Sequence, residues 1–155
     1  MRVTRSRTLR AGAPAVWAVL ADPYALPRWW PLARRVEGVT EGGWTVVLGR
    51  EGGRGVRADQ TLEASEPQRF RRWALVVPGS PFERVVASSV TEARLEPAGE
   101  GATLTLSLEQ RPAGWARLGR LMLRRAAKRQ LDAALEGMAR CVDREPAPLG
   151  GARAS

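Results

Sequence analysis

The stretch that decides the fold is "ADPYALPRWWP", residues 21–31, in which three prolines and two adjacent tryptophans share eleven positions. Asp22-Pro23 predicts the end of a preceding helix, because the residue before a proline avoids the helical conformation. A second short helix or turn is predicted over 23–28, and Pro31 closes it. Because neighbouring side chains point in different directions, one of Trp29 and Trp30 is expected to face the core. The other is expected to point away from the core.

The residues before this stretch predict a strand and then a helix. Residues 2–10 alternate between two faces with a polar bias, which is typical of a strand at a sheet edge. Gly12 and Pro14 then indicate a helix start, since proline is favoured in the first helical turn.

After residue 31 the hydrophobic period changes to two, which predicts strands. Short turns of the kind "PAGEG" separate the runs, so the strands are expected to pair as antiparallel neighbours. The predicted strands are 34–41, 42–49, 56–65, 69–77, 82–96 and 102–111.

A long amphipathic helix is predicted over about 114–143, with no internal proline. It is the only element large enough to cover one face of the sheet. The expected fold is therefore α+β: a curved antiparallel sheet of about seven strands wrapped on a long C-terminal helix, with two short helices after the first strand. Residues 1–144 are expected to form a single domain, and 145–155 a disordered Pro/Gly-rich tail.

Four stretches resemble the START-like, Bet v 1-like superfamily (SRPBCC), which includes polyketide cyclase/dehydrase and lipid-transport proteins. They are "APAVWAVLADPYALPRWWP", "EPQRFRRWAL", "RLEPAGEGATLTLSLEQRP" and the long last helix, and the resemblance covers residues 2–143. It implies a helix-grip fold with an apolar cavity between sheet and helix that holds a hydrophobic ligand.

Composition excludes several kinds of site. The chain has 155 residues, no histidine and one cysteine, so the usual zinc sites and Ser-His or Cys-His nucleophiles cannot form. No metal and no cofactor are expected. No apolar run follows the first charged residues, so we expect no secretory signal, and the lone Cys141 suits a cytoplasmic location.

The net charge is +9, yet all but one of the 25 basic residues are Arg, in a chain that is also rich in Ala, Gly and Pro. This pattern is typical of a GC-rich genome, and no nucleic-acid partner is expected. An Arg stripe at 117, 120 and 124, continued by Lys128, is interpreted as the solvated outer face of the last helix. Peripheral contact of this stripe with an anionic membrane remains an alternative.

The predicted strand from 82 to 96 carries small side chains on one face, opposite alanines of the long helix, which favours a cavity. The alternative is that tryptophans fill that space. Of the tryptophan pair, one is expected to pack under the long helix and the other to lie at the mouth of the pocket or on the surface. The candidate ligand-pocket residues are Tyr24, Trp29, Trp30, Trp44, Gln60, Trp73, Val85, Ala87, Ser89, Thr91, Leu131 and Leu135.

The preferred function is binding of a small hydrophobic ligand, a lipid or polyketide-like molecule, as a carrier or sensor. One alternative is a cofactor-free polyketide cyclase or dehydratase, which needs an ionisable group in the cavity. Asp59 and Glu92 are expected to face outward, and Glu83 to face inward at a strand start. Each is interpreted as a solvated surface charge, and no catalytic residue is assigned. A second alternative is a basic module that docks a membrane, a ribosome or an acidic partner. The ligand and the oligomeric state stay open.

Overall fold

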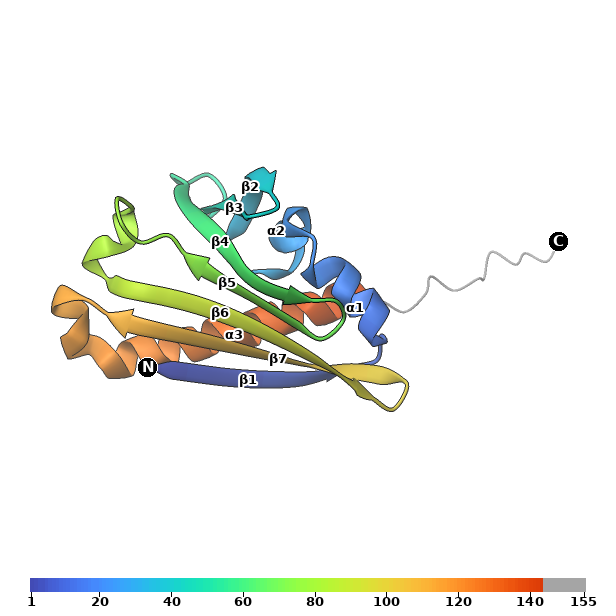
Figure 1. The fold of residues 1–155 in the computed structure, drawn as a ribbon. Coiled ribbons are helices and arrows are strands. Elements are labelled where there is room, and N and C mark those ends of the chain that lie inside the picture. The colour runs from blue at the N-terminus through green and yellow to red at the C-terminus, as the bar shows by residue number, and fades with distance from the viewer. Residues whose placement is uncertain (144–155) are drawn as a thin grey trace.

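Seven antiparallel strands form one curved sheet in the structure, a computed structural model that describes residues 1–143 (Figure 1). The strand order is β1-β7-β6-β5-β4-β3-β2, so the first strand pairs with the last, and β1 and β2 form the edges. The strands are β1 (Arg2–Leu9), β2 (Ala33–Thr40), β3 (Gly43–Leu48), β4 (Val56–Glu66), β5 (Phe70–Leu75), β6 (Val86–Ala98) and β7 (Gly101–Pro112).

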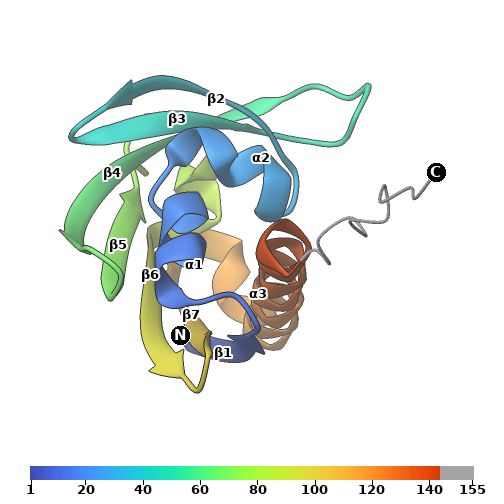
Figure 2. The same cartoon turned by 90° about the vertical axis from the view of Figure 1, so that its right-hand side faces the viewer.

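The helices lie on the concave side of this sheet (Figure 2). Between β1 and β2 the chain forms α1 (Ala13–Leu20), the 3₁₀ helix η1 (Pro23–Ala25) and α2 (Leu26–Trp29), and α3 (Arg120–Val142) follows β7. The α+β helix-grip arrangement predicted from the sequence is confirmed. No helix within residues 1–143 combines the length and the apolar character needed to cross a membrane. The predicted tail, 145–155, lies outside the described residues.

The core lies between the sheet and α3. Along β7 the side chains of Leu104, Leu106 and Leu108 are buried, as their alternation with polar residues predicts. They face α3 residues such as Leu131 and Met138, which are fully buried. Burial of this apolar surface from both sides holds the helix in the curve of the sheet.

The predicted strand over 82–96 is wrong at its start. Residues Pro81–Arg84 form the 3₁₀ helix η2, capped by the Ser80 hydroxyl, which accepts a hydrogen bond from the Phe82 amide. The strand begins at Val86, and one extra residue is accommodated between Val86 and Ser88 opposite β7. This β-bulge shifts the alternation, so Ala87 becomes exposed while Val86 and Ser89 face the concave side.

The predicted long helix also differs at its start. Residues Gly114–Gly119 form the 3₁₀ helix η3, and the α-helix begins only at Arg120. Gly114 has a positive φ of 55°, and Gly119, the residue before α3, has φ −102° and ψ 29°, outside the helical region. The positive φ of Gly114 favours glycine, whereas the backbone at Gly119 is open to other residues, and the two positions bound a separate turn before the long helix.

A close contact between helices lies where α3 crosses the end of α2. Gly137 faces the backbone of Trp29, and a Cβ atom at Gly137 would lie 2.8 Å from the Trp29 Cα and closer still to the Trp29 carbonyl oxygen. Backbone at such a distance cannot move aside as a flexible side chain would. Only glycine therefore allows the two helices to cross this closely.

We expect Gly137→Ala to destabilise the protein by about 1–3 kcal/mol through overpacking. In an open helix the same change would stabilise by up to about 1 kcal/mol, so the sign of the effect separates the two cases. The measurement is the free energy of unfolding in urea. Gly119→Ala, where a Cβ would meet nothing within 4 Å, is the matched control and should change stability little. A stabilised Gly137→Ala variant would contradict the close crossing.

An ion-pair cluster lies on the convex face of the sheet around Glu92. Its carboxylate accepts hydrogen bonds from Arg2 at 3.0 Å and from Arg72 at 2.5 Å, and its side chain is only 10% exposed. Glu92 faces outward as predicted, but its neighbours cover it. Partial burial acts to raise the pKa of Glu92, and the two arginines outweigh this and hold the pKa below its ordinary value of 4.5.

A carboxylate with a lowered pKa stabilises the folded state above its ordinary pKa and loses that effect as the pH falls through the folded value. We therefore expect Glu92→Gln to cost about 1–3 kcal/mol at pH 7. The difference between variant and wild type should shrink as the pH falls below 4.5 and through the lowered pKa of Glu92 in the folded protein. Urea unfolding at a series of pH values measures it. A difference that does not change with pH would show that the charge of Glu92 contributes nothing.

Candidate functional site: a cavity between the sheet and the last helix

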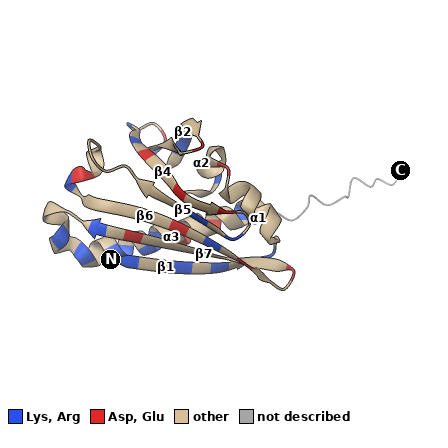
Figure 3. Cartoon of the chain, viewed as in Figure 1, with Lys and Arg blue, Asp and Glu red and all other residues tan. Residues whose placement is uncertain are grey.

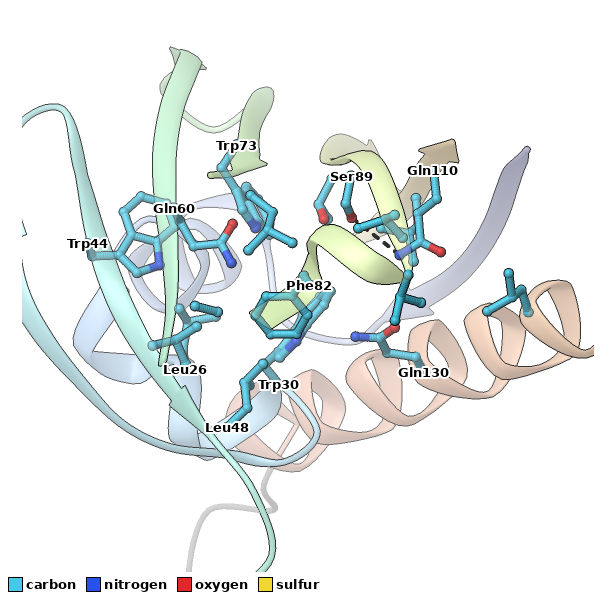
Figure 4. Close-up of a pocket in the computed structure, with 18 residues that line it drawn as sticks. Leu26, Trp30, Trp44, Leu48, Gln60, Trp73, Phe82, Ser89, Gln110 and Gln130 are labelled. Atoms are coloured by element: carbon cyan, nitrogen blue, oxygen red, sulfur yellow. Dashed lines mark hydrogen bonds between the residues drawn. The ribbon is translucent and has the colours of Figure 1, made fainter. Parts of the chain in front are cut away.

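A cavity of about 430 Å³ lies between the concave face of the sheet, α2 and α3 (Figure 4). Its wall is contributed by α2 and the residue after it, by strands β3 to β7, by η2 and by the N-terminal half of α3. The lining residues are Leu26, Trp30, Trp44, Val46, Leu48, Ala58, Gln60, Trp73, Leu75, Phe82, Val85, Val86, Ser89, Thr91, Leu108, Gln110, Leu123 and Gln130.

A chain of indole rings forms one side of the cavity. The Trp30 ring lies 6.2 Å from the Trp73 ring at an angle of 71°, and Trp73 lies 6.2 Å from Trp44 at 55°. Trp30 in turn meets the buried ring of Trp29 edge to face at 5.4 Å. Such contacts between rings fix their orientation as well as their position. The tryptophans therefore present rigid apolar walls and leave the cavity open.

Polar groups enter the cavity from several sides (Figure 4). Gln60 comes from β4, Gln110 from β7 and Gln130 from α3, and the Gln110 side-chain amide donates a hydrogen bond to the Ser89 hydroxyl at 3.3 Å. Thr91 adds a second hydroxyl. Each amide offers both a donor and an acceptor. The cavity can thus hold an apolar body and hydrogen-bond its polar substituents.

No charged side chain of residues 1–143 lines this cavity. Asp59 is exposed on β4, Glu83 is exposed on η2 rather than inward-facing at a strand start, and Glu92 lies on the convex face. Arg71 is buried but is not among the lining residues. Its guanidinium lies 5.5 Å from the Trp44 ring centre, and burial lowers its pKa. The cavity itself therefore contains only neutral polar groups.

The structure brings seven of the twelve predicted pocket residues together around the cavity, namely Trp30, Trp44, Gln60, Trp73, Val85, Ser89 and Thr91. The other five lie elsewhere. Tyr24 is 62% exposed on η1, and Ala87 is turned outward by the bulge. Trp29, Leu131 and Leu135 are core residues, each at most 3% exposed, so close packing leaves no free surface for a ligand.

Sequence reasoning missed several lining residues for which a signal existed. Gln110 continues the inward alternation of Leu104, Leu106 and Leu108, and Gln130 follows Ala127 on the inner side of the last helix. A polar residue on an otherwise apolar face was therefore visible at both positions. Phe82 carried no such signal, because its position depends on the 3₁₀ turn of η2.

Residues 1–143 match the family model described as "Polyketide cyclase / dehydrase and lipid transport". The chain belongs to this family. The polyketide cyclase/dehydrase and lipid-transport family that the four sequence stretches predicted is thereby confirmed. No curated protein sequence matches the chain.

Solved structures share the fold at low sequence identity. A START superfamily protein from Mycobacterium smegmatis is 12% identical with a TM-score of 0.72, covering 92% of this chain and 97% of its own. The protein TTHA0849 from Thermus thermophilus is 18% identical (TM-score 0.73; 91% and 96% covered). XoxI from Bacillus cereus is 14% identical (TM-score 0.73; 91% and 94% covered). At these identities the likeness shows the fold alone.

The adjacent tryptophans should differ in their contribution to stability. Trp29 is 3% exposed within the core, so we expect Trp29→Ala to cost about 3–5 kcal/mol. Trp30 borders the open cavity on one side and has fewer packing partners to lose, so Trp30→Ala should cost roughly half as much. Urea unfolding of both variants measures the difference. Equal costs, or a larger cost at Trp30, would contradict an open cavity beside this ring.

Proposed function

We propose that the protein binds an uncharged, flat, largely hydrophobic small molecule in the cavity, as a carrier or sensor. The observation that carries the proposal is the composition of the wall, in which aromatic rings and three glutamine amides surround the space and no charged side chain of the described residues faces it. A lipid or polyketide-like molecule that carries carbonyl or hydroxyl groups has the matching chemistry. Membership of a family named for polyketide and lipid proteins supports this class.

The size and polarity of the cavity support binding of a single small molecule. About 430 Å³ falls within the range of about 300–1,000 Å³ that is typical of small-molecule sites. An anionic or cationic ligand would lose its hydration and find no opposite charge among the lining residues, which is costly. A neutral ligand avoids this cost, and its polar groups can pair with Gln60, Gln110 and Gln130.

The cyclase or dehydratase alternative is less well supported. Proton transfer in such reactions uses a side chain that gains and loses a proton near neutral pH. The described lining residues offer amides and hydroxyls, which orient a substrate but do not serve as such a group. Binding without chemical change is therefore the function that this wall favours.

A binding panel tests the proposal. It compares neutral polycyclic keto and hydroxy aromatics, a sterol, a fatty acid and an arylalkylamine, which is cationic at neutral pH. Tryptophan fluorescence is the readout, because three tryptophans line the cavity. Organic extraction of the purified protein followed by mass spectrometry identifies any co-purified molecule. We expect the neutral aromatics to bind at least about tenfold more tightly than their charged counterparts, a difference of about 1.4 kcal/mol.

Two neighbouring serines provide a matched pair of variants. Ser89→Leu places a larger side chain in the cavity and should weaken binding at least about tenfold, while the fold is retained because the space was open. Ser88, one residue earlier and opposite Arg111 of β7, has its side chain on the other face of the sheet. The Ser88→Leu variant should therefore bind as wild type does. Equal binding by the two variants, or preferred binding of the fatty acid or the amine, would overturn the proposal.

A further inference from the structure

A group of large apolar side chains stands in solvent at the start of the last helix. Trp115 is 87% exposed, Leu118 83%, Met122 75% and Leu121 62%. The other large exposed hydrophobic residues among 1–143 are spread over different elements, whereas these four, here called the crest, follow one another within eight residues. Exposed apolar side chains that cluster in this way mark an interaction surface.

The local structure aligns the crest. Trp115 and Leu118 are three residues apart in the 3₁₀ helix η3, which has three residues per turn, so they lie on the same side. Leu121 and Met122, in the first turn of α3, follow Leu118 by three and four residues. Residues at these spacings lie on the same face of a helix, so both continue the side that carries Leu118. The crest is therefore a continuous apolar ridge rather than a set of unrelated positions.

Positive charge surrounds the crest. Between Glu109 and Asp132 the chain has seven basic residues and no acidic one. None of the seven forms an ion pair with another described residue, whereas arginines elsewhere, such as Arg5, Arg57 and Arg72, do. Figure 3 shows this blue-coloured group at the end of the molecule where α3 begins. The seven are Arg111, Arg117, Arg120, Arg124, Arg125, Lys128 and Arg129.

Three of these arginines border a hollow beside the crest. Arg111, Arg117 and Arg120, together with Met1, Ala87 and Pro112, line a surface depression of about 570 Å³ where η3 leaves β7. Guanidinium groups bind phosphate oxygens in paired hydrogen bonds. The depression thus suits phosphate head groups beside an inserted apolar ridge.

The crest also lies next to one end of the ligand cavity. Leu123, which follows Met122, lines the cavity. Val85, another lining residue, is 44% exposed, and its carbonyl oxygen accepts a hydrogen bond from the Ala113 amide at 2.9 Å, directly before η3. A surface bound to the crest would therefore meet the protein close to where the cavity reaches solvent.

We propose that the crest and its surrounding basic residues form a docking surface for an anionic lipid bilayer. Tryptophan favours the interface between lipid and water, and aliphatic side chains gain by entering the acyl region. Arginine and lysine around them are attracted to anionic head groups. Nucleic acid would satisfy the charges but would leave the leucines and the methionine in water, so charge and apolar surface together select the bilayer.

Vesicle co-sedimentation tests the docking surface without reference to the cavity ligand. The probes are vesicles of phosphatidylcholine alone and of a 3:1 mixture with phosphatidylglycerol, roughly a membrane-like anionic content. We expect wild type to bind the anionic vesicles at least about tenfold more tightly, with binding that weakens as salt increases. Trp115→Ser/Leu118→Ser and Arg124→Glu/Arg125→Glu should each reduce binding by about tenfold or more.

A charge-matched control removes the effect of net charge. Arg50→Glu/Arg54→Glu changes the net charge equally in the loop between β3 and β4 and should bind as wild type does. Circular dichroism checks that each variant is folded. The proposal is overturned if wild type does not prefer anionic vesicles, or if the control loses binding equally. It is also overturned if RNA competes fully and the Trp115→Ser/Leu118→Ser variant binds vesicles normally, since a general polyanion surface would behave in that way.

Discussion

The rest of the structure depends on the contact between Gly137 of α3 and the backbone of Trp29. Because no side chain separates the helices there, the end of α2 is pressed against the long helix. Trp29 is then enclosed in the core, and Trp30, the next residue, must point away into the space under the sheet. The ring of Trp30 orients Trp73, and Trp73 orients Trp44. One missing Cβ atom thereby determines the position of an entire cavity wall.

The sheet sorts charge between its two faces. On the convex face, Glu92 is enclosed by arginines of β1 and β5, which link strands that are not neighbours in sequence. On the concave face around the cavity, the polar groups of the described residues are neutral amides and hydroxyls. The separation follows from strand alternation, because successive residues face opposite sides. The lining residues therefore carry no formal charge, and the one buried arginine nearby, Arg71, lies against the Trp44 ring without an ion pair to any described residue.

The fold and part of the site could be predicted from the sequence because they depend on periodicity. Alternation along the strands gave the inward positions of Trp44, Gln60 and Trp73, which line the cavity. Ala87 was predicted on the wrong face because a one-residue bulge between Val86 and Ser88 reverses which face the preceding side chains occupy. The alternation of apolar and polar residues does not reveal such an insertion. Leu131 and Leu135 were assigned correctly to the inner face of the helix, but whether a buried side chain meets packed neighbours or open space depends on the three-dimensional fit. Which of Trp29 and Trp30 is buried in the core likewise depends on the close helix crossing at Gly137, which the sequence pattern does not reveal.

The three cavity glutamines have a consequence for the range of ligands. A carboxylate only accepts hydrogen bonds and an ammonium only donates them, but a primary amide can turn over and exchange the two roles. The walls of Trp30, Trp44 and Trp73 fix the outline of the space, while Gln60, Gln110 and Gln130 adapt to whichever group a ligand presents. The cavity is therefore selective for shape and tolerant of substitution pattern. Under the proposed function, we therefore expect such a pocket to accept a set of molecules with one skeleton rather than a single compound.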